Sequence, residues 1–172
     1  MIANFAAEYE RYKIVGERAL AQIPDEALNQ MPYTEGNSAA MIVRHLSGNF
    51  LSRFTDFLTT DGEKPWRDRE AEFANVEYTR QQVNEHWAQG WAVIFNALQS
   101  LRDEDQSTQV TIRSVPLTVH EALCRSLAHV AMHVGQIIVL ARFYHQGAWQ
   151  SLSIPKGESA QYNANPTKEK RP

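Results

Sequence analysis

The fold is decided by one apolar stretch near the C-terminus, which reads Leu127-Ala-His-Val-Ala-Met-His-Val-Gly-Gln-Ile-Ile-Val-Leu140. Its apolar side chains recur every three to four residues, which is the period of an amphipathic helix. The two histidines in it, His129 and His133, are four residues apart, or ~400° of helical rotation. Both imidazoles therefore leave one face of the helix about a turn apart and can bind a single metal ion.

The helix that contains this stretch is predicted to run from Thr118 to about His145. Thr118 and Glu121 have the spacing of a capping box at its start, and Gly147 follows its end. Its inward stripe consists of Leu123, Leu127, Val130, Val134, Ile137 and Ala141. A different side of the helix is also apolar, through Met132, Val139 and Phe143. A helix that is apolar over most of its circumference is usually buried deeply, which favours a homodimer interface here; extra cover from loops of the same chain is the alternative.

Three more long helices are predicted from the same periodicity, over residues 2–22, 38–58 and 79–101. Ser38 can cap the second helix, and Thr79 with Gln82 has the spacing of another capping box. Residues 109–113 and 117–119 are predicted to form a small hairpin. Four long amphipathic segments with one short hairpin before the last predict an all-α fold, a four-helix bundle.

The composition is that of one globular domain of ordinary polarity. The chain has 172 residues, of which 43% are hydrophobic and 22% charged, and a net charge of -3. This charge gives no reason to expect a nucleic acid or an anionic membrane as a partner. The single cysteine, Cys124, excludes an internal disulfide, suits a reducing compartment and is expected to be a small buried residue. No signal peptide or membrane span is expected, so we predict a cytoplasmic domain over residues 1–163 and a flexible tail over residues 164–172.

A third histidine strengthens the case for a metal site. His45 lies in Ile42-Val-Arg-His-Leu-Ser-Gly-Asn49, beside the apolar stripe of the second predicted helix. Each histidine taken alone is more simply read as a hydrogen-bonded core residue. Three of them near the core border of two helices are harder to explain by packing, because a buried imidazole is costly unless both nitrogens have partners. We therefore predict that His45, His129 and His133 are metal ligands.

The remaining histidines give no sign of joining that site. His120 lies on the opposite side of its helix from His129, and His86 lies on a mostly polar helix edge. His145 is at a helix C-terminus, where a positive charge is favoured.

Weaker candidates surround the three histidines in the sequence. Asn49 and Arg53 follow His45 at one-turn intervals, and Gln136 follows His133. These positions suit catalytic roles for all three residues. The alternative is that each is an ordinary solvated helix residue. The connection over residues 59–78 is long for a compact domain, and connections of this length are often functional.

Within that connection, Lys64-Pro-Trp-Arg-Asp-Arg69 provides an indole and two guanidinium groups. This combination suits an anionic organic ligand, with Trp66 and Arg67 as substrate-binding residues. A surface loop held down by Trp66 is the alternative.

The chain resembles the DinB-like superfamily. The resemblance rests on His45-Leu-Ser-Gly-Asn49, on Ala128-His-Val-Ala-Met-His-Val-Gly-Gln-Ile137 and on the spacing of the four helices, and it extends to about residue 163. Asp61-Gly-Glu-Lys-Pro-Trp66 and Ile154-Pro-Lys-Gly157 resemble an uncharacterised branch. The resemblance implies a divalent metal held at one end of the bundle by one histidine of the second helix and two of the fourth. It also implies frequent homodimers and a relation to transferases that use low-molecular-weight thiols such as bacillithiol or mycothiol.

These expectations lead to a functional hypothesis with open alternatives. Three neutral imidazoles leave a coordination position open, as in catalytic zinc sites. The preferred hypothesis is a metal-dependent enzyme that activates a small thiol for attack on an electrophilic small molecule, with zinc or nickel as the expected ion and iron as a further possibility. A metal-dependent hydrolase and a non-enzymatic, stress-associated metal-binding or scaffold protein are the alternatives.

Overall fold

The computed structural model describes residues 1–167 and has four long helices and one short hairpin. The long helices are α1 (Ile2–Leu20), α2 (Ala39–Phe54), α4 (Arg80–Ser100) and α5 (Val119–Tyr144). The hairpin pairs β1 (Gln109–Ile112) with β2 (Val115–Thr118) in antiparallel register. Short helical turns complete the described chain: η1 (Asp25–Ala27), α3 (Arg69–Glu72), η2 (Asp103–Ser107) and α6 (Ser159–Ala164). The predicted all-α bundle with a hairpin before its last long helix is confirmed.

The helix starts lie where the sequence places them, because the caps form as expected. The Ser38 hydroxyl accepts a hydrogen bond from the backbone N–H of Met41. Complete capping boxes open α4, through Thr79 and Gln82, and α5, through Thr118 and Glu121. Each box satisfies two backbone N–H groups that the first turn of a helix leaves unpaired.

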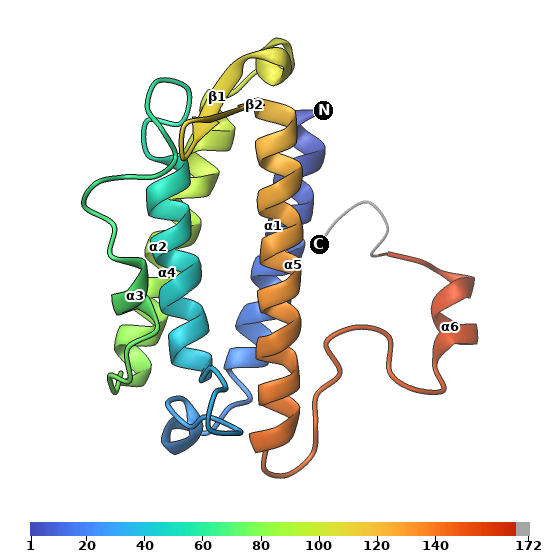
Figure 1. The fold of residues 1–172 in the computed structure, drawn as a ribbon. Helices are drawn as coiled ribbons and strands as arrows, with labels where there is room; N and C mark the ends of the chain where they lie inside the picture. Colours follow the sequence, from blue (N-terminus) through green and yellow to red (C-terminus); the bar gives the residue numbers. More distant parts are fainter. Residues whose placement is uncertain (168–172) are drawn as a thin grey trace.

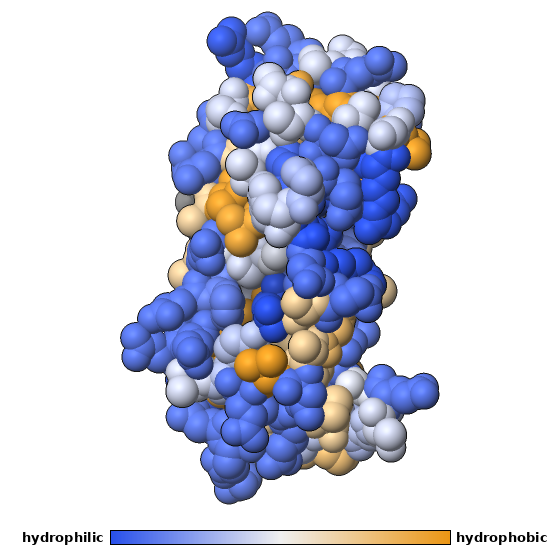
Figure 2. All heavy atoms as spheres, turned by 60° about the vertical axis from the view of Figure 1, so that its left-hand side comes forward, coloured by the Kyte–Doolittle hydropathy of each residue, from blue (hydrophilic) through white to orange (hydrophobic). Residues whose placement is uncertain are grey.

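The topology explains why the connection between α2 and α4 is so long. In Figure 1, α2 and α4 form one pair and run in the same direction; α1 and α5 form the other pair, and both run in the opposite direction to the first pair. The chain between two parallel neighbours must return along the length of the bundle, and residues 55–79 do so on the outer side of α2. The short α3 lies in this crossover connection. Figure 2 shows that this side of the molecule is mostly hydrophilic, with only small apolar patches.

The core side of α5 agrees with the predicted stripe. Five of its six members are buried, and Leu127 is half-buried. Met132, Val139 and Phe143 on the other side are 54%, 67% and 68% exposed, so no loop within residues 1–167 covers them. Contact of this face with a second copy of the chain stays a prediction. Within residues 1–167, α5 is also the one helix that meets the length and composition of a membrane span, a test that a bundle's core helix also passes.

Several boundaries and one environment differ from the sequence predictions. The second helix ends at Phe54, short of the predicted end at Leu58, because Thr55 is extended and Asp56 takes a left-handed φ of 50°. Cys124 is exposed, not buried. It lies on the α5 surface beside His120, with 3.5 Å between Sγ and Nε2.

The end of the chain contains a helix that the sequence did not indicate. The predicted domain boundary at residue 163 falls inside α6. Of the predicted tail, residues 168–172 lie outside the described part of the chain.

The crossover connection is fastened to the hairpin through one aspartate. Arg113 and Ser114 form the hairpin turn with φ values of 54° and 62°, a left-handed conformation that is costly for residues other than glycine. The Asp61 carboxylate accepts hydrogen bonds from the backbone N–H groups of both residues, at 2.8 and 2.7 Å, and also from Glu63 N–H at 2.7 Å. These bonds lower the pKa of Asp61 from its ordinary 3.8 to about 2. The ionised carboxylate therefore stabilises the turn and the start of the connection together.

We expect Asp61→Asn to lower the melting temperature at pH 7 by about 2–4 °C, because an amide presents only one acceptor oxygen to three N–H donors. The folded pKa of Asp61 is depressed, so the carboxylate stabilises the fold above about pH 4, and this contribution is lost as the pH falls towards 2. Thermal unfolding of both proteins at pH 7, 4 and 3 tests this. A melting difference that stays constant over this range would contradict the role assigned to the carboxylate.

Candidate metal centre

The three predicted ligands meet between α2 and α5. His129 Nε2 lies 3.1 Å from His45 Nε2 and 3.1 Å from His133 Nε2. The ligand atoms of all three lie within 4.8 Å of one another. His45 and His133 are buried, and His129 is half-buried. The structure therefore brings together one histidine of α2 and two of α5 in an arrangement that can hold a metal ion.

The hydrogen bonds behind the rings show that this set of donors fits a cation. His45 Nδ1 donates to Glu72 Oε2 at 2.8 Å, and His133 Nδ1 donates to Gln136 Oε1 at 2.8 Å. A neutral imidazole that donates through Nδ1 carries a lone pair on Nε2. Two such lone pairs face His129 Nε2, which has at most one proton to share between them. A cation at their meeting point would satisfy all three nitrogens.

The surroundings of His129 and His133 favour the neutral form that a metal ligand needs. Burial and then the neighbouring His133 and His45 lower the pKa of His129 from 6.5 to about 3. Burial also lowers the pKa of His133. Neutral imidazole is the form that binds metal, so little proton release is needed for an ion to bind near neutral pH.

Glu72 of α3 supports His45 from the crossover connection. Its two oxygens also accept hydrogen bonds from Arg67, at 2.8 Å from Nε and 3.0 Å from a terminal nitrogen. The side chains of His45, Glu72 and Arg67 are all at least 94% buried. Burial alone would raise the pKa of Glu72, but the hydrogen bonds from His45 and Arg67 outweigh it and lower this pKa below its usual range. A carboxylate in this position fixes the orientation and tautomer of a metal-binding histidine.

Two further contacts hold this arrangement in place. The ring of Phe73 packs on the ring of His45, with 4.6 Å between centroids. Gly48 of α2 leaves the space that Glu72 occupies: a Cβ there would collide with Glu72 Oε1 and lie 2.8 Å from its Cδ.

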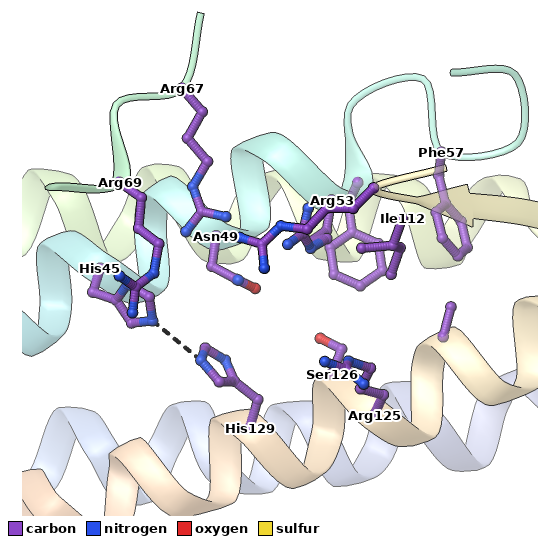
Figure 3. Close-up of a pocket in the computed structure, with 13 residues that line it drawn as sticks. His45, Asn49, Arg53, Phe57, Arg67, Arg69, Ile112, Arg125, Ser126 and His129 are labelled. Carbon is purple, nitrogen blue, oxygen red and sulfur yellow. Dashed lines mark hydrogen bonds between the residues drawn. The ribbon is translucent and has the colours of Figure 1, made fainter. Parts of the chain in front are cut away.

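A cavity of about 270 Å³ begins at His45 and His129 and continues between α2 and α5. One wall carries His45, Asn49 and Arg53, which recur at one-turn intervals on α2, and the other carries His129, Ser126 and Arg125 of α5 (Figure 3). Ligands arranged at the end of a cavity leave room for a second molecule beside them.

Comparison with known proteins places this chain in a family. A family model described as "Protein of unknown function (DUF1572)" matches residues 1–158. The chain belongs to the DUF1572 family. A search of the curated proteins found no match.

Among solved structures, this DUF1572 protein is similar to the crystal structure of a DinB-like protein from Bacillus cereus ATCC 10987. The TM-score is 0.63 with 19% sequence identity, and the match covers 84% of this chain and 95% of that one. At this identity the likeness shows the fold, and the predicted DinB-like fold is thereby confirmed.

The weaker site predictions have different outcomes in the DUF1572 structure. Asn49 and Arg53 line the cavity. Gln136 lies behind His133 and orients its ring, so it does not face the cavity. Trp66 is 58% exposed and does not line the cavity, while the Arg67 guanidinium does so but is occupied by Glu72.

Sequence reasoning missed Glu72. The spacing patterns that predicted the ligands belong to the long helices, whereas Glu72 reaches His45 from a short helix in the connection. Two signals indicated that a segment approaches α2 here, although neither identified Glu72: the unusual length of that connection, and Gly48, one turn from His45 in an otherwise well-formed helix. A mid-helix glycine costs about 1 kcal/mol relative to alanine and often marks a close approach.

We expect Gly48→Ala to weaken metal binding by about 10- to 100-fold, because the added methyl group displaces Glu72 from His45. Affinity for Zn²⁺ is measured by competition with a chromogenic chelator. Gly135→Ala on α5 is the matched control, since a Cβ there meets nothing within 4 Å. Equal affinities for the wild type and Gly48→Ala would show that Glu72 does not support the site.

Proposed function

We propose that this protein is a divalent-metal-dependent enzyme that activates a low-molecular-weight thiol for transfer to an electrophilic small molecule. One observation carries the proposal: the three histidines converge at the end of a cavity that His45 and His129 line. A purely structural metal site is closed by four protein ligands, whereas the described residues offer three histidines. When bound there, a divalent ion would lower the pKa of a thiol so that it ionises near neutral pH.

In this proposal the residues of the chain hold and orient the reactants. His45, His129 and His133 hold the ion, with Glu72 and Gln136 fixing the rings of His45 and His133. Asn49 lines the cavity one turn along α2 from His45, where its amide can both donate and accept hydrogen bonds to a bound molecule.

The proposed transfer is a nucleophilic substitution in which one bond forms and one breaks. The thiol sulfur forms a bond to the electrophilic carbon. The bond from that carbon to the leaving group breaks, and the leaving group takes the electron pair. The thiol proton passes to water. The electrophile is proposed to occupy the cavity and not the surface around Trp66, because Trp66 does not line it.

The alternatives receive less support. Hydrolysis needs a general base, and no aspartate or glutamate lines the cavity within residues 1–167; both Glu72 oxygens are already engaged. A scaffold that uses the metal only to join α2 to α5 does not account for the cavity. Imidazole ligands suit zinc, nickel and iron alike, and we propose zinc or nickel, in a cytoplasmic protein that meets its thiol there.

We expect the purified protein to carry about one divalent ion per chain and His129→Ala to lose it, because two remaining imidazoles cannot hold an ion tightly. Elemental analysis of both proteins measures this. His120→Ala is the control, since His120 is an exposed histidine of the same helix outside the cluster. Stoichiometric metal retained by His129→Ala would mean that the ligands are different.

The metal-loaded protein is expected to accelerate the reaction of a small thiol, such as bacillithiol or mycothiol, with a fluorogenic alkyl halide. His129→Ala should lower this rate at least 100-fold, whereas His120→Ala should leave it unchanged. Absence of metal-dependent turnover with any of several thiols would refute thiol transfer while leaving the metal site itself intact.

A further inference from the structure

The cavity beside the histidines is strongly cationic. Five of its thirteen lining residues are arginines, namely Arg53, Arg67, Arg69, Arg113 and Arg125. No aspartate or glutamate lines it in the part of the chain that the structure describes. A divalent ion held by three neutral imidazoles would add further positive charge at one end.

Three of these guanidinium groups are compensated by carboxylates behind the cavity wall. Arg67 is held by Glu72, as described above. Arg53 and Arg113 share one oxygen of Glu63, at 3.2 and 2.9 Å. These arginines serve the structure of the connection and the hairpin as well as the cavity.

The other two arginines lack a buried partner. Arg69 lies 3.2 Å from Glu70, but the two side chains are 48% and 89% exposed, and such surface pairs contribute little. Arg125 forms no hydrogen bond or ion pair with any residue of 1–167 and lies one turn from His129 on the same face of α5. Its guanidinium is therefore available to a ligand.

Along both α2 and α5, the histidines and the arginines follow one another in the same direction through the cavity. On α2, Arg53 lies two turns beyond His45; on α5, Arg125 lies one turn before His129, and the helices run in opposite directions (Figure 1). Both walls thus have their imidazoles at one end and their guanidinium groups further along. With a rise of 1.5 Å per residue, Arg125 is displaced along the helix by about 6 Å from His129.

We propose that Arg125 anchors an oxyanion, a carboxylate or phosphate, of a small-molecule substrate whose reacting group points towards the three histidines. The proposal rests on the function proposed above and adds the chemical class of the substrate. A guanidinium group binds carboxylate or phosphate through two parallel hydrogen bonds. The cavity is also at the small end of ligand pockets, which typically measure about 300–1,000 Å³, so a compact acid fits it better than a large cofactor.

The test measures anion binding and metal content on the same samples, without turnover. Isothermal titration calorimetry is performed on the metal-loaded protein with succinate, inorganic phosphate and, as the neutral counterpart, succinamide. The variants are Arg125→Gln and Arg125→Lys. Arg102→Gln is the matched control, because Arg102 is 79% exposed and does not line the cavity. Elemental analysis accompanies each titration.

We expect succinate or phosphate to bind and succinamide not to bind. Arg125→Gln should weaken the anion about tenfold or more, and Arg125→Lys should weaken it less, whereas Arg102→Gln should bind like the wild type. Because the Arg125 side chain is exposed, all variants should keep their fold and their metal. Binding of succinate alone assigns a carboxylate, and binding of phosphate alone assigns a phosphate.

Two results separate the failure of this inference from the failure of the proposed function. Metal-loaded protein that binds neither anion, or binds one with equal affinity in Arg125→Gln, overturns the anion site while the metal site stands. If the protein takes up no metal but binds an anion in a way that depends on Arg125, the anion site is supported and the metal-dependent function is refuted.

Discussion

The Glu72 carboxylate ties the crossover connection to the bundle, and the candidate site depends on this one interaction. It accepts hydrogen bonds from His45 of α2 and from Arg67 of the connection, and all three side chains are almost fully buried. A buried ion pair of this kind adds little net stability, but removal of one partner typically costs about 3–5 kcal/mol because the other charge is left uncompensated. The interaction therefore fixes a single position for the connection. It also determines which nitrogen of His45 faces His129.

The electrostatics of the site follow from the same arrangement. Burial lowers the pKa of His129 and of His133, and the nearby arginines lower the pKa of His129 further. Glu72 and Glu63 lie behind the wall and compensate the arginines that shape the loop. The positive charges that have no buried carboxylate partner, those of Arg69 and Arg125, face the cavity. A site built in this way attracts anions and repels cationic ligands, so electrostatics alone narrows the range of small molecules that can enter.

The sequence predicted those parts of the structure that depend on local patterns. The helices of the bundle and their starts follow from apolar periodicity and from caps such as Thr118 with Glu121, which need only neighbouring residues. The convergence of the three histidines was predictable because the DinB-like resemblance supplied the pairing of α2 with α5. The early end of α2 depends on the backbone at Thr55 and Asp56, where no proline or glycine marks a stop.

The parts that could not be predicted depend on contacts between distant segments. Glu72 is 27 residues from His45, and nothing in its local sequence distinguishes it from Glu70. Trp66 shows the same dependence, since its local sequence does not distinguish an exposed indole on a turn from one that lines a cavity, and the structure leaves it exposed. No sequence pattern indicates that Arg125 lines a cavity either, because the opposite wall of that cavity is formed by α2 and the connection.

The cavity itself argues that the site does more than join two helices. A metal ion between α2 and α5 would stabilise the bundle equally well if the space beyond His129 were filled with apolar side chains. Replacing buried or half-buried charges by well-packed apolar groups is often neutral or stabilising. Here, instead, Arg53 and Arg67 have lost much of their contact with water, and Arg69 and Arg125 face the same cavity without a buried carboxylate partner. Such an arrangement costs stability in the unliganded protein, and a bound anion is the simplest partner that would offset that cost.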